Sequence, residues 1–322
     1  MRSVRWIRIV ASGACVIAGL IAAAVTLSRL SGSEAYAPTL LVSFVPHVIP
    51  AYALVLAAAL AAGRRLRSSA VAVGVPVLAA AGLVAHLLWV SPDLLPDETT
   101  ASREGTPVRV LSINATRGQA EPGDLRRLIR RVDPDILVVT EVRAPLLGRL
   151  DALVPADLPR AAGSGYRLDT QIFTAYDSPG ATELGLSLGG WRTDLDIGGA
   201  EVEVFGVHPF SPFNDSAAWR EDHAALQAAV DTTSGPALII GDLNATRDHP
   251  PLRRLADLGF RDAADLAGSG WQPTYPADGM LPSLLRIDHV LARGGWRVER
   301  TETYPLRGAD HRALAVDLVL GS

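Results

Sequence analysis

Three long apolar stretches in the first 90 residues limit what this chain can fold into. They run from Ile7 to Leu27, from Thr39 to Ala62 and from Ser69 to Val90. A helix needs about 20 predominantly apolar residues to span the hydrocarbon core of a bilayer, and each stretch is close to that length. The sequence therefore predicts three transmembrane helices.

Arginine residues are distributed unevenly around these stretches. The loop between the first two stretches carries Arg29 and Glu34. Six arginines lie before or at the start of the first stretch, or separate the second from the third: Arg2, Arg5, Arg8, Arg64, Arg65 and Arg67. Because cytoplasmic loops are enriched in Lys and Arg, we expect a cytoplasmic amino terminus. An odd number of crossings then places the rest of the chain outside the cytoplasm, in a multi-pass protein of the cell membrane.

A cleaved signal peptide is an alternative interpretation of the first stretch. Ala35-Tyr36-Ala37 matches the small-residue cleavage pattern that follows a basic start and an apolar core. The second and third stretches would still enter and leave the membrane, so the remainder of the chain would still lie outside.

A polar segment separates the membrane region from the rest of the chain. Residues 93–106 show no apolar periodicity, and Pro92, Pro96 and Pro107 occur in or beside them. This composition is typical of a linker. We therefore expect a membrane region over residues 1–90, a linker over 91–106 and a domain over 107–322.

Apolar patterns with the periods of strands and helices alternate along this domain. The expected strands cover residues 108–114, 135–142, 202–207, 237–243, 286–291, 296–304 and 313–320. The expected helices cover residues 122–132, 216–230 and 251–258. Two β-rich halves with helices outside predict an α/β fold, a two-sheet α/β sandwich whose loops collect polar residues at one edge.

Charge and cysteine content exclude some partners and chemistries. The formal net charge of −4 offers no broad basic field for a nucleic-acid backbone, so nucleic acid is not the expected partner. The single cysteine, Cys15, lies in the first apolar stretch. The domain therefore has no thiol for a disulfide or for cysteine catalysis. Nothing in the sequence indicates a protein partner.

Polar side chains directly follow the apolar runs of the domain. They are Asn114, Glu141, His208, Asp242 with Asn244, Asp288, and Asp310 with His311. Buried strands that end at one edge would direct these groups into a common cleft. Carboxylate, amide and imidazole groups in this arrangement predict a metal-assisted site that cleaves phosphoesters.

Each of these residues also has a plain structural interpretation. Glu141 fits an ordinary carboxylate at a strand end, and Asn114 fits a turn residue that bonds to its own backbone. His208 fits a packed histidine, and the pair Asp310-His311 fits a turn cap. Position alone leaves these alternatives open.

Three short motifs carry a resemblance to a known family. They are Gly241-Asp242-Leu243-Asn244-Ala245, Arg286-Ile287-Asp288-His289-Val290 and Ala309-Asp310-His311-Arg312. The order and approximate spacing of these motifs resemble those of the endonuclease/exonuclease/phosphatase superfamily, and the resemblance covers about residues 107–320. It implies a DNase I-like fold and phosphoesterase activity. With its apolar stretches, the whole chain is similar to VanJ-type membrane proteins associated with teicoplanin resistance. Its carboxyl-terminal half is also similar to YafD-type bacterial members.

The resemblance implies a metal site. Asn114, Glu141 and Asp310 would lie beside a divalent metal, with Glu141 as a direct carboxylate ligand. Oxygen ligands of this kind favour Mg²⁺ or Mn²⁺.

The resemblance also implies catalytic roles for His208, Asp242, Asn244, Asp288 and His311. Asp242 would orient or activate the attacking water, and Asn244, on the same strand face, would donate a hydrogen bond to the phosphoryl oxygen. His311, oriented by Asp288, would bond to the phosphoryl group. His208 would assist departure of the leaving group.

These expectations combine into one functional hypothesis. We expect a membrane-anchored, extracytoplasmic, magnesium-dependent phosphohydrolase that acts on a lipid-linked phosphate or pyrophosphate, such as undecaprenyl pyrophosphate or a cell-wall lipid intermediate. A surface-anchored nuclease is one alternative, and it would need a basic groove. A catalytically inactive, membrane-anchored binding protein is another alternative. Proteins that have lost catalytic activity have usually also lost the polar site residues, and these residues are present here.

Overall fold

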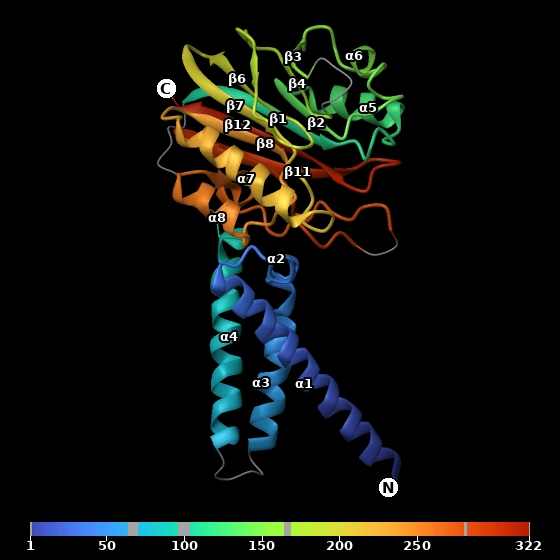
Figure 1. Ribbon diagram of the computed structural model, residues 1–322, viewed down its shortest axis with the longest axis vertical. Coiled ribbons are helices and arrows are strands. Elements are labelled where there is room, and N and C mark those ends of the chain that lie inside the picture. The colour runs from blue at the N-terminus through green and yellow to red at the C-terminus, as the bar shows by residue number, and fades with distance from the viewer. Residues whose placement is uncertain (1, 64–69, 96–103, 164–168, 280–281, 322) are drawn as a thin grey trace. The chain divides into compact units, whose positions relative to one another are not determined.

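The computed structural model describes residues 2–63, 70–95, 104–163, 169–279 and 282–321 (Figure 1). Contacts divide the chain into two compact units. One contains Met1–Ser91 with Asp248–Pro250, and the other contains Pro92–Arg247 with Pro251–Ser322. The expected membrane topology was based on six arginines, and the side chains of all six lie outside the described part of the chain. Residues 96–103 of the expected linker also lie outside it.

The amino-terminal unit is helical over its described residues. Its elements are α1 (Arg2–Ser31), α2 (Tyr36–Val42), the 3-10 helix η1 (Pro46–Val48), α3 (Ile49–Gly63) and α4 (Ala70–Leu94). Two helical segments are long and apolar enough to cross a membrane, Ser12–Ser31 in α1 and Val73–Leu94 in α4. The first and third predicted spans therefore correspond to continuous apolar helices.

The second apolar stretch differs from the straight helix that the sequence predicted. It forms α2 and the segment Pro46–Ala62, which meet at an angle of 67°. Proline lacks an N–H and its ring crowds the carbonyl four residues earlier, so Pro46 disfavours a straight helix that includes both Val42 and Pro46. By length and composition, the described chain has two helices able to cross a membrane, and three only if the bent pair is one span.

The second unit confirms the predicted α/β sandwich with two six-stranded sheets (Figure 1). The first sheet has the order β11 (Trp296–Pro305), β12 (Arg312–Gly321), β1 (Gly105–Asn114), β2 (Ile136–Thr140), β4 (Gln171–Thr174) and β3 (Arg160–Ala162). The second has the order β5 (Ala181–Glu183), β6 (Gly190–Ile197), β7 (Ala200–Val207), β8 (Ala237–Asp242), β10 (Asp288–Arg293) and β9 (Arg261–Asp262). Both sheets are mixed, because β1 is parallel to β2 and β7 is parallel to β8.

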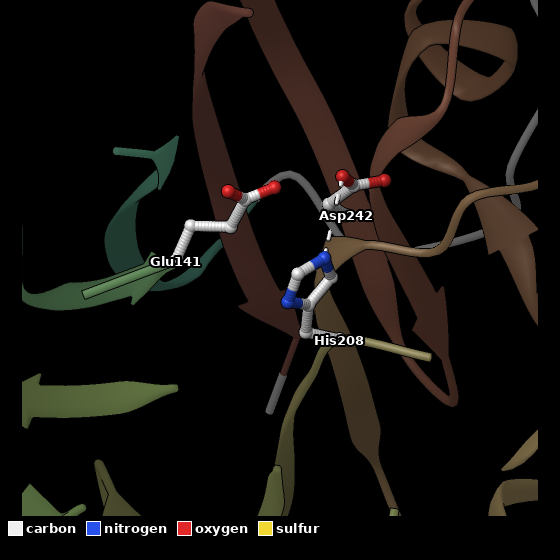
Figure 2. Close-up of side chains that lie close together, drawn as sticks. All are labelled: Glu141, His208 and Asp242. Atoms are coloured by element: carbon white, nitrogen blue, oxygen red, sulfur yellow. Dashed lines mark ion pairs between the residues drawn. The ribbon is translucent and has the colours of Figure 1, made fainter. Parts of the chain in front are cut away.

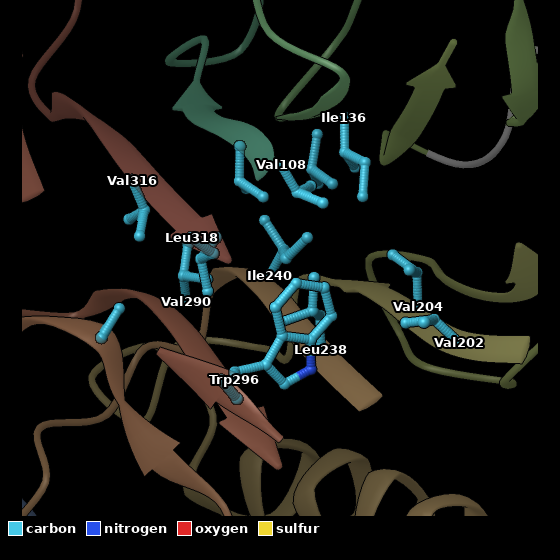
Figure 3. Packing of buried hydrophobic residues seen from close by; sticks show 14 of the residues in the cluster. Val108, Ile136, Val202, Val204, Leu238, Ile240, Val290, Trp296, Val316 and Leu318 are labelled. Atoms are coloured by element: carbon cyan, nitrogen blue, oxygen red, sulfur yellow. The ribbon is translucent and has the colours of Figure 1, made fainter. Parts of the chain in front are cut away.

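Alternate residues of the central strands face the space between the sheets. Leu238 and Ile240 of β8 lie there in one cluster with Val108 of β1 (Figure 3). Ile239 belongs instead to an outer cluster with Trp219 of α7 (Ser216–Asp231). Since successive side chains on a strand point to opposite faces, both faces of β8 are covered. This explains why β8 has a continuous apolar sequence rather than an alternating one.

Helices cover the outer faces of the two sheets. The helix α5 (Pro122–Val132) packs on the first sheet, and α7 packs on the second with α8 (Pro250–Asp257) (Figure 1). Two short helices complete the described elements, α6 (Leu150–Leu153) and α9 (Ala263–Ala267). The predicted helices are confirmed, and the predicted strands are confirmed with ends that differ by a few residues.

Candidate active site

The ends of four central strands bring predicted polar residues together. Because β1 is parallel to β2 and β7 to β8, the carboxyl ends of each pair meet at one edge. Asn114 ends β1, Glu141 follows β2, His208 follows β7 and Asp242 ends β8. Nδ2 of Asn114 donates hydrogen bonds to Oδ2 of Asp242, at 2.9 Å, and to Oε1 of Glu141, at 3.2 Å. Asn114 therefore joins the edges of the two sheets.

Glu141, His208 and Asp242 form one compact group, with a ligand atom from each lying within 4.8 Å of the others (Figure 2). Nε2 of His208 is 3.7 Å from Oδ2 of Asp242. Glu141 has a φ of 54°, a left-handed conformation that is uncommon for a non-glycine residue. Its Oε2 accepts a 2.8 Å hydrogen bond from the N–H of Arg117, which holds the carboxylate at the site.

Asp242, Asp288 and His311 form a second group that shares Asp242 with the first. Strands β8 and β10 are antiparallel, and their register places Asp288 opposite Asp242. Nδ1 of His311 is 2.8 Å from Oδ2 of Asp288, and Nε2 is 3.7 Å from Oδ2 of Asp242. The predicted Asp288–His311 pairing is therefore present in the structure.

Both histidines are held in the cationic form. Burial by itself would lower their pKa values, because it disfavours the charged ring. In His208, the hydrogen bond to Asp169 and the charges of Asp169 and Asp242 outweigh burial and raise the pKa to about 9. In His311, the charges of Asp288 and Asp242 raise the pKa to about 10. At neutral pH each ring can therefore donate a hydrogen bond to an anionic substrate.

Asp242 differs from an ordinary aspartate. Burial raises its pKa to about 6; the charge of Asp288 acts in the same direction, and the positive charges of His311 and His208 oppose it. Its Oδ1 accepts a 2.8 Å hydrogen bond from the N–H of Asn244. A carboxyl group with a pKa just below neutrality is ionised at pH 7 and can still accept a proton, which suits a general base.

The donor set fits a divalent cation. Glu141, Asp242 and Asp288 bring three carboxylates into the two groups, and like charges at such separations repel one another unless a cation neutralises them. Among the described residues, the buried Oδ1 of Asp288 has no hydrogen-bond partner. Carboxylate oxygens are the ligands that hard divalent cations prefer. The cluster is therefore suited to a metal-dependent reaction.

Asp310 and Asn244 lie nearby in arrangements that the sequence did not predict. Oδ1 of Asp310 accepts a 2.6 Å hydrogen bond from Oγ1 of Thr116, and Asp310 belongs to neither group. The placement of Asn244 on a strand with Asp242 is wrong, because β8 ends at Asp242 and Asn244 has a φ of 47°. Nδ2 of Asn244 donates a 3.1 Å hydrogen bond to the carbonyl of Pro209. The roles expected for both residues stay predictions.

The sequence interpretation missed Asp169. Its Oδ1 lies 3.2 Å from Nδ1 of His208, on the side of the ring away from Asp242. Asp169 lies two residues before β4, and Asp288 begins β10, so the position of an acidic residue at or just before the start of a strand was the available signal. Residues 164–168, which precede Asp169, lie outside the described chain.

Arg286 and His289, which lie beside Asp288 in its motif, form buried contacts next to the site. The buried Arg286 forms ion pairs with Asp265, at 2.8 Å, and with Asp262, at 3.6 Å. The ring of His289 lies between Oδ2 of Asp262, at 2.5 Å, and the carbonyl of Ala245, at 2.9 Å. These contacts connect β9 and β10 to the loop that follows Asp242.

Comparisons with known proteins agree with this geometry. A sequence model described as "Endonuclease/Exonuclease/phosphatase family" matches residues 110–311. A search of curated protein sequences finds no significant match.

Several solved structures share the fold. Truncated TDP2 from Caenorhabditis elegans is 19% identical, with a TM-score of 0.54 over 66% of this chain and 98% of the other. The mannosyl-6-phosphatase Bt3783 of Bacteroides thetaiotaomicron is 17% identical, with a TM-score of 0.52 over 66% and 99% of the two chains. TDP2 from D. rerio, complexed with a single-strand DNA product, is 13% identical, with a TM-score of 0.53 over 66% and 98%. At these identities the likeness shows the fold alone.

Proposed function

The chain belongs to the endonuclease/exonuclease/phosphatase family, and from this premise we propose that it is a membrane-anchored, extracytoplasmic phosphohydrolase acting on a lipid-linked phosphate or pyrophosphate. Undecaprenyl pyrophosphate and cell-wall lipid intermediates are the leading substrates. The observation that carries the hydrolytic assignment is Asp242, a buried carboxylate shared by two groups that each contain a histidine.

Hydrolysis of a phosphoester adds water across a P–O bond, and the site has a group for each part of that change. Asp242 would accept the proton of the attacking water as its oxygen bonds to phosphorus. His311 would donate a hydrogen bond to a phosphoryl oxygen. His208 would give a proton to the leaving oxygen as the P–O bond breaks.

The carboxylates give these steps a metal site. Glu141, with Asn114 and Asp310 beside it, would hold a divalent cation that neutralises charge on the phosphoryl oxygens. We propose Mg²⁺ or Mn²⁺ because the side chains offer mainly oxygen ligands.

The choice of a lipid-linked substrate is supported by the composition of the chain. Apolar helices would place the domain at a membrane. A net charge of −4 gives little attraction for a nucleic-acid backbone. The similarity to VanJ-type proteins adds the hypothesis that glycopeptide resistance is a downstream effect, which deletion and drug-sensitivity testing would check.

The deciding experiment measures phosphate release from undecaprenyl pyrophosphate by the detergent-solubilised protein. It includes Mg²⁺, EDTA and the variant His311→Ala, with a plasmid substrate at low salt beside them. Release that needs both the metal and His311 would support the proposal. Plasmid cleavage without lipid turnover would instead identify an anchored nuclease, and inactivity on both substrates would reject these two substrates while leaving the fold intact.

A further inference from the structure

A cavity of about 930 Å³ opens beside the candidate active site. Six polar residues of its lining are Thr116, Arg117, Glu141, Asp278, Arg307 and Asp310. Glu141 and Asp310 are the carboxylates expected beside the metal, so the cavity begins where the attacked phosphoryl group would lie. Its volume is within the range of ligand pockets and leaves room for more than a single phosphoryl group.

Arg117 is held at the edge of this cavity by an unusual turn. Thr116, Arg117 and Gly118 have φ values of 49°, 55° and 77°, so three consecutive residues are left-handed. The N–H of Thr116 donates to Oδ1 of Asn114 and the N–H of Arg117 donates to Oε2 of Glu141, both at 2.8 Å. Non-glycine residues in this conformation cost free energy, and they cluster at functional sites. The turn fixes the Arg117 backbone directly against an active-site carboxylate.

The two arginines of the cavity lining differ in their ion pairs. Arg307, the other arginine of the lining, pairs with Asp124 at 3.1 Å. Arg117 is exposed, and its guanidinium forms no ion pair within the described parts of the chain. The remaining acid of the lining, Asp278, is exposed to solvent. The Arg117 guanidinium is therefore available to a bound anion, and its planar N–H donors match phosphate oxygens.

We propose that Arg117 binds the second phosphoryl group of a diphosphate substrate in this cavity, while the first is attacked at Asp242. The inference rests on the proposed function. It predicts that the enzyme prefers diphosphates to monophosphates and to phosphodiesters whose two substituents are uncharged. Arg117 is then a specificity-determining residue, because it contacts the leaving phosphoryl group, which a diphosphate has and a monophosphate lacks.

The test compares three substrates of the full-length protein in detergent: a short-chain prenyl diphosphate, the matching prenyl monophosphate, and bis(p-nitrophenyl) phosphate. The variants are Arg117→Ala and Arg117→Lys. Arg126→Ala is the matched control, because Arg126 is an exposed arginine of α5 outside the cavity lining. Inhibition of diester cleavage by inorganic pyrophosphate gives a binding readout that does not depend on the prenyl chain.

Arg117→Ala is expected to lower kcat/KM for the diphosphate by about 10- to 100-fold, the effect of one lost charge-assisted hydrogen-bonding group. Cleavage of the diester should change less than about threefold, pyrophosphate should inhibit more weakly, and Arg117→Lys should keep part of the preference. Equal losses on all substrates, or an unchanged diphosphate preference, would overturn the inference while the proposed function stands. A wild-type protein inactive on all three substrates would overturn both.

Discussion

At the scale of single residues, Asp242 connects every reacting group of the candidate site. Its Oδ2 accepts from Asn114 and lies 3.7 Å from a ring nitrogen of both His208 and His311. Removing its charge should therefore affect proton transfer and the protonation of both histidines together.

Asp242→Asn should lower kcat by about 10²- to 10⁴-fold, the usual contribution of a general base. The substitution nearly conserves the shape of the side chain, so the melting temperature should change little by comparison. Asp257→Asn, at an exposed position that ends α8, is the matched control. Wild-type kcat in Asp242→Asn would exclude this residue as the base.

Asp169 contacts the ring of His208, so in the proposed mechanism it would be a positioning residue. Its charge raises the pKa of His208, and Asp169→Asn should therefore lower that pKa. If His208 is the proton donor, activity falls as pH rises through its pKa, so the alkaline limb of the kcat/KM profile should move from near pH 9 to lower pH. Asp157→Asn, an exposed control, should leave the limb in place. An unmoved limb in Asp169→Asn would contradict this role.

His311 should make the stability of the metal-free protein depend on pH. Its folded pKa of about 10 is above the ordinary value of 6.5, so its stabilising contribution is complete below pH 6.5 and is lost as pH rises through about 10. In EDTA, the melting temperature should fall between pH 7 and pH 10, and it should fall less in His311→Gln. Parallel pH dependences of the two proteins would refute the ion pair with Asp288.

At the scale of elements, the register between strands determines the site. β8 runs beside β7 in parallel and beside β10 in antiparallel register, which brings one strand start and two strand ends to the same edge. Gly241, paired with Val207, stands next to His208 and Asp242 in this arrangement. A Cβ at Gly241 would lie 2.0 Å from the carbonyl oxygen of Val207, and its φ of 145° disfavours other residues.

Gly241→Ala should therefore force β7 and β8 apart at the active-site edge. We expect a loss of about 3 kcal/mol in stability, from overpacking and backbone strain together, and a lower kcat. The melting temperature reports the first effect and a turnover assay the second. Gly235→Ala, just before β8, is the control because its nearest added contact is at 3.8 Å. Equal stability of the two variants would contradict the close approach at Gly241.

At the scale of the whole molecule, the two compact units differ in how much apolar surface they expose. The amino-terminal unit contains exposed apolar side chains along α1 and α4, which are costly in water and favourable in lipid. The other unit buries its apolar residues between its two sheets and beneath the segments that cover their outer faces. The functional proposal places this second unit outside the cytoplasm.

Cysteine labelling tests that placement, because Cys15 is the single cysteine of the chain. In a Cys15→Ser background, Asp157→Cys introduces a thiol at an exposed position of the sandwich. A membrane-impermeant maleimide should label it in intact cells. Labelling that requires cell lysis would place the domain in the cytoplasm and remove the support for an envelope substrate.

The sequence by itself determined the local features of this protein. Local features can be recognised from neighbouring residues, because the backbone period decides which side chains share a face. Examples are the apolar run of β8, the helical period of α5 and the polar residues at the ends of central strands. The motifs around Asp242, Asp288 and Asp310 then indicated the family without any tertiary information.

Only the tertiary structure decided which of these features meet. Asp169 reaches His208 from 39 residues away, Asn244 leaves the strand to contact Pro209, and Arg117 borders a cavity that also contains Arg307. Such contacts depend on strand order, register and the packing of two sheets, which are set by long-range burial rather than by local pattern. Most polar residues of the site and the pairing of Asp288 with His311 were therefore predictable, whereas Asp169 and the contacts of Asn244 and Arg117 were not.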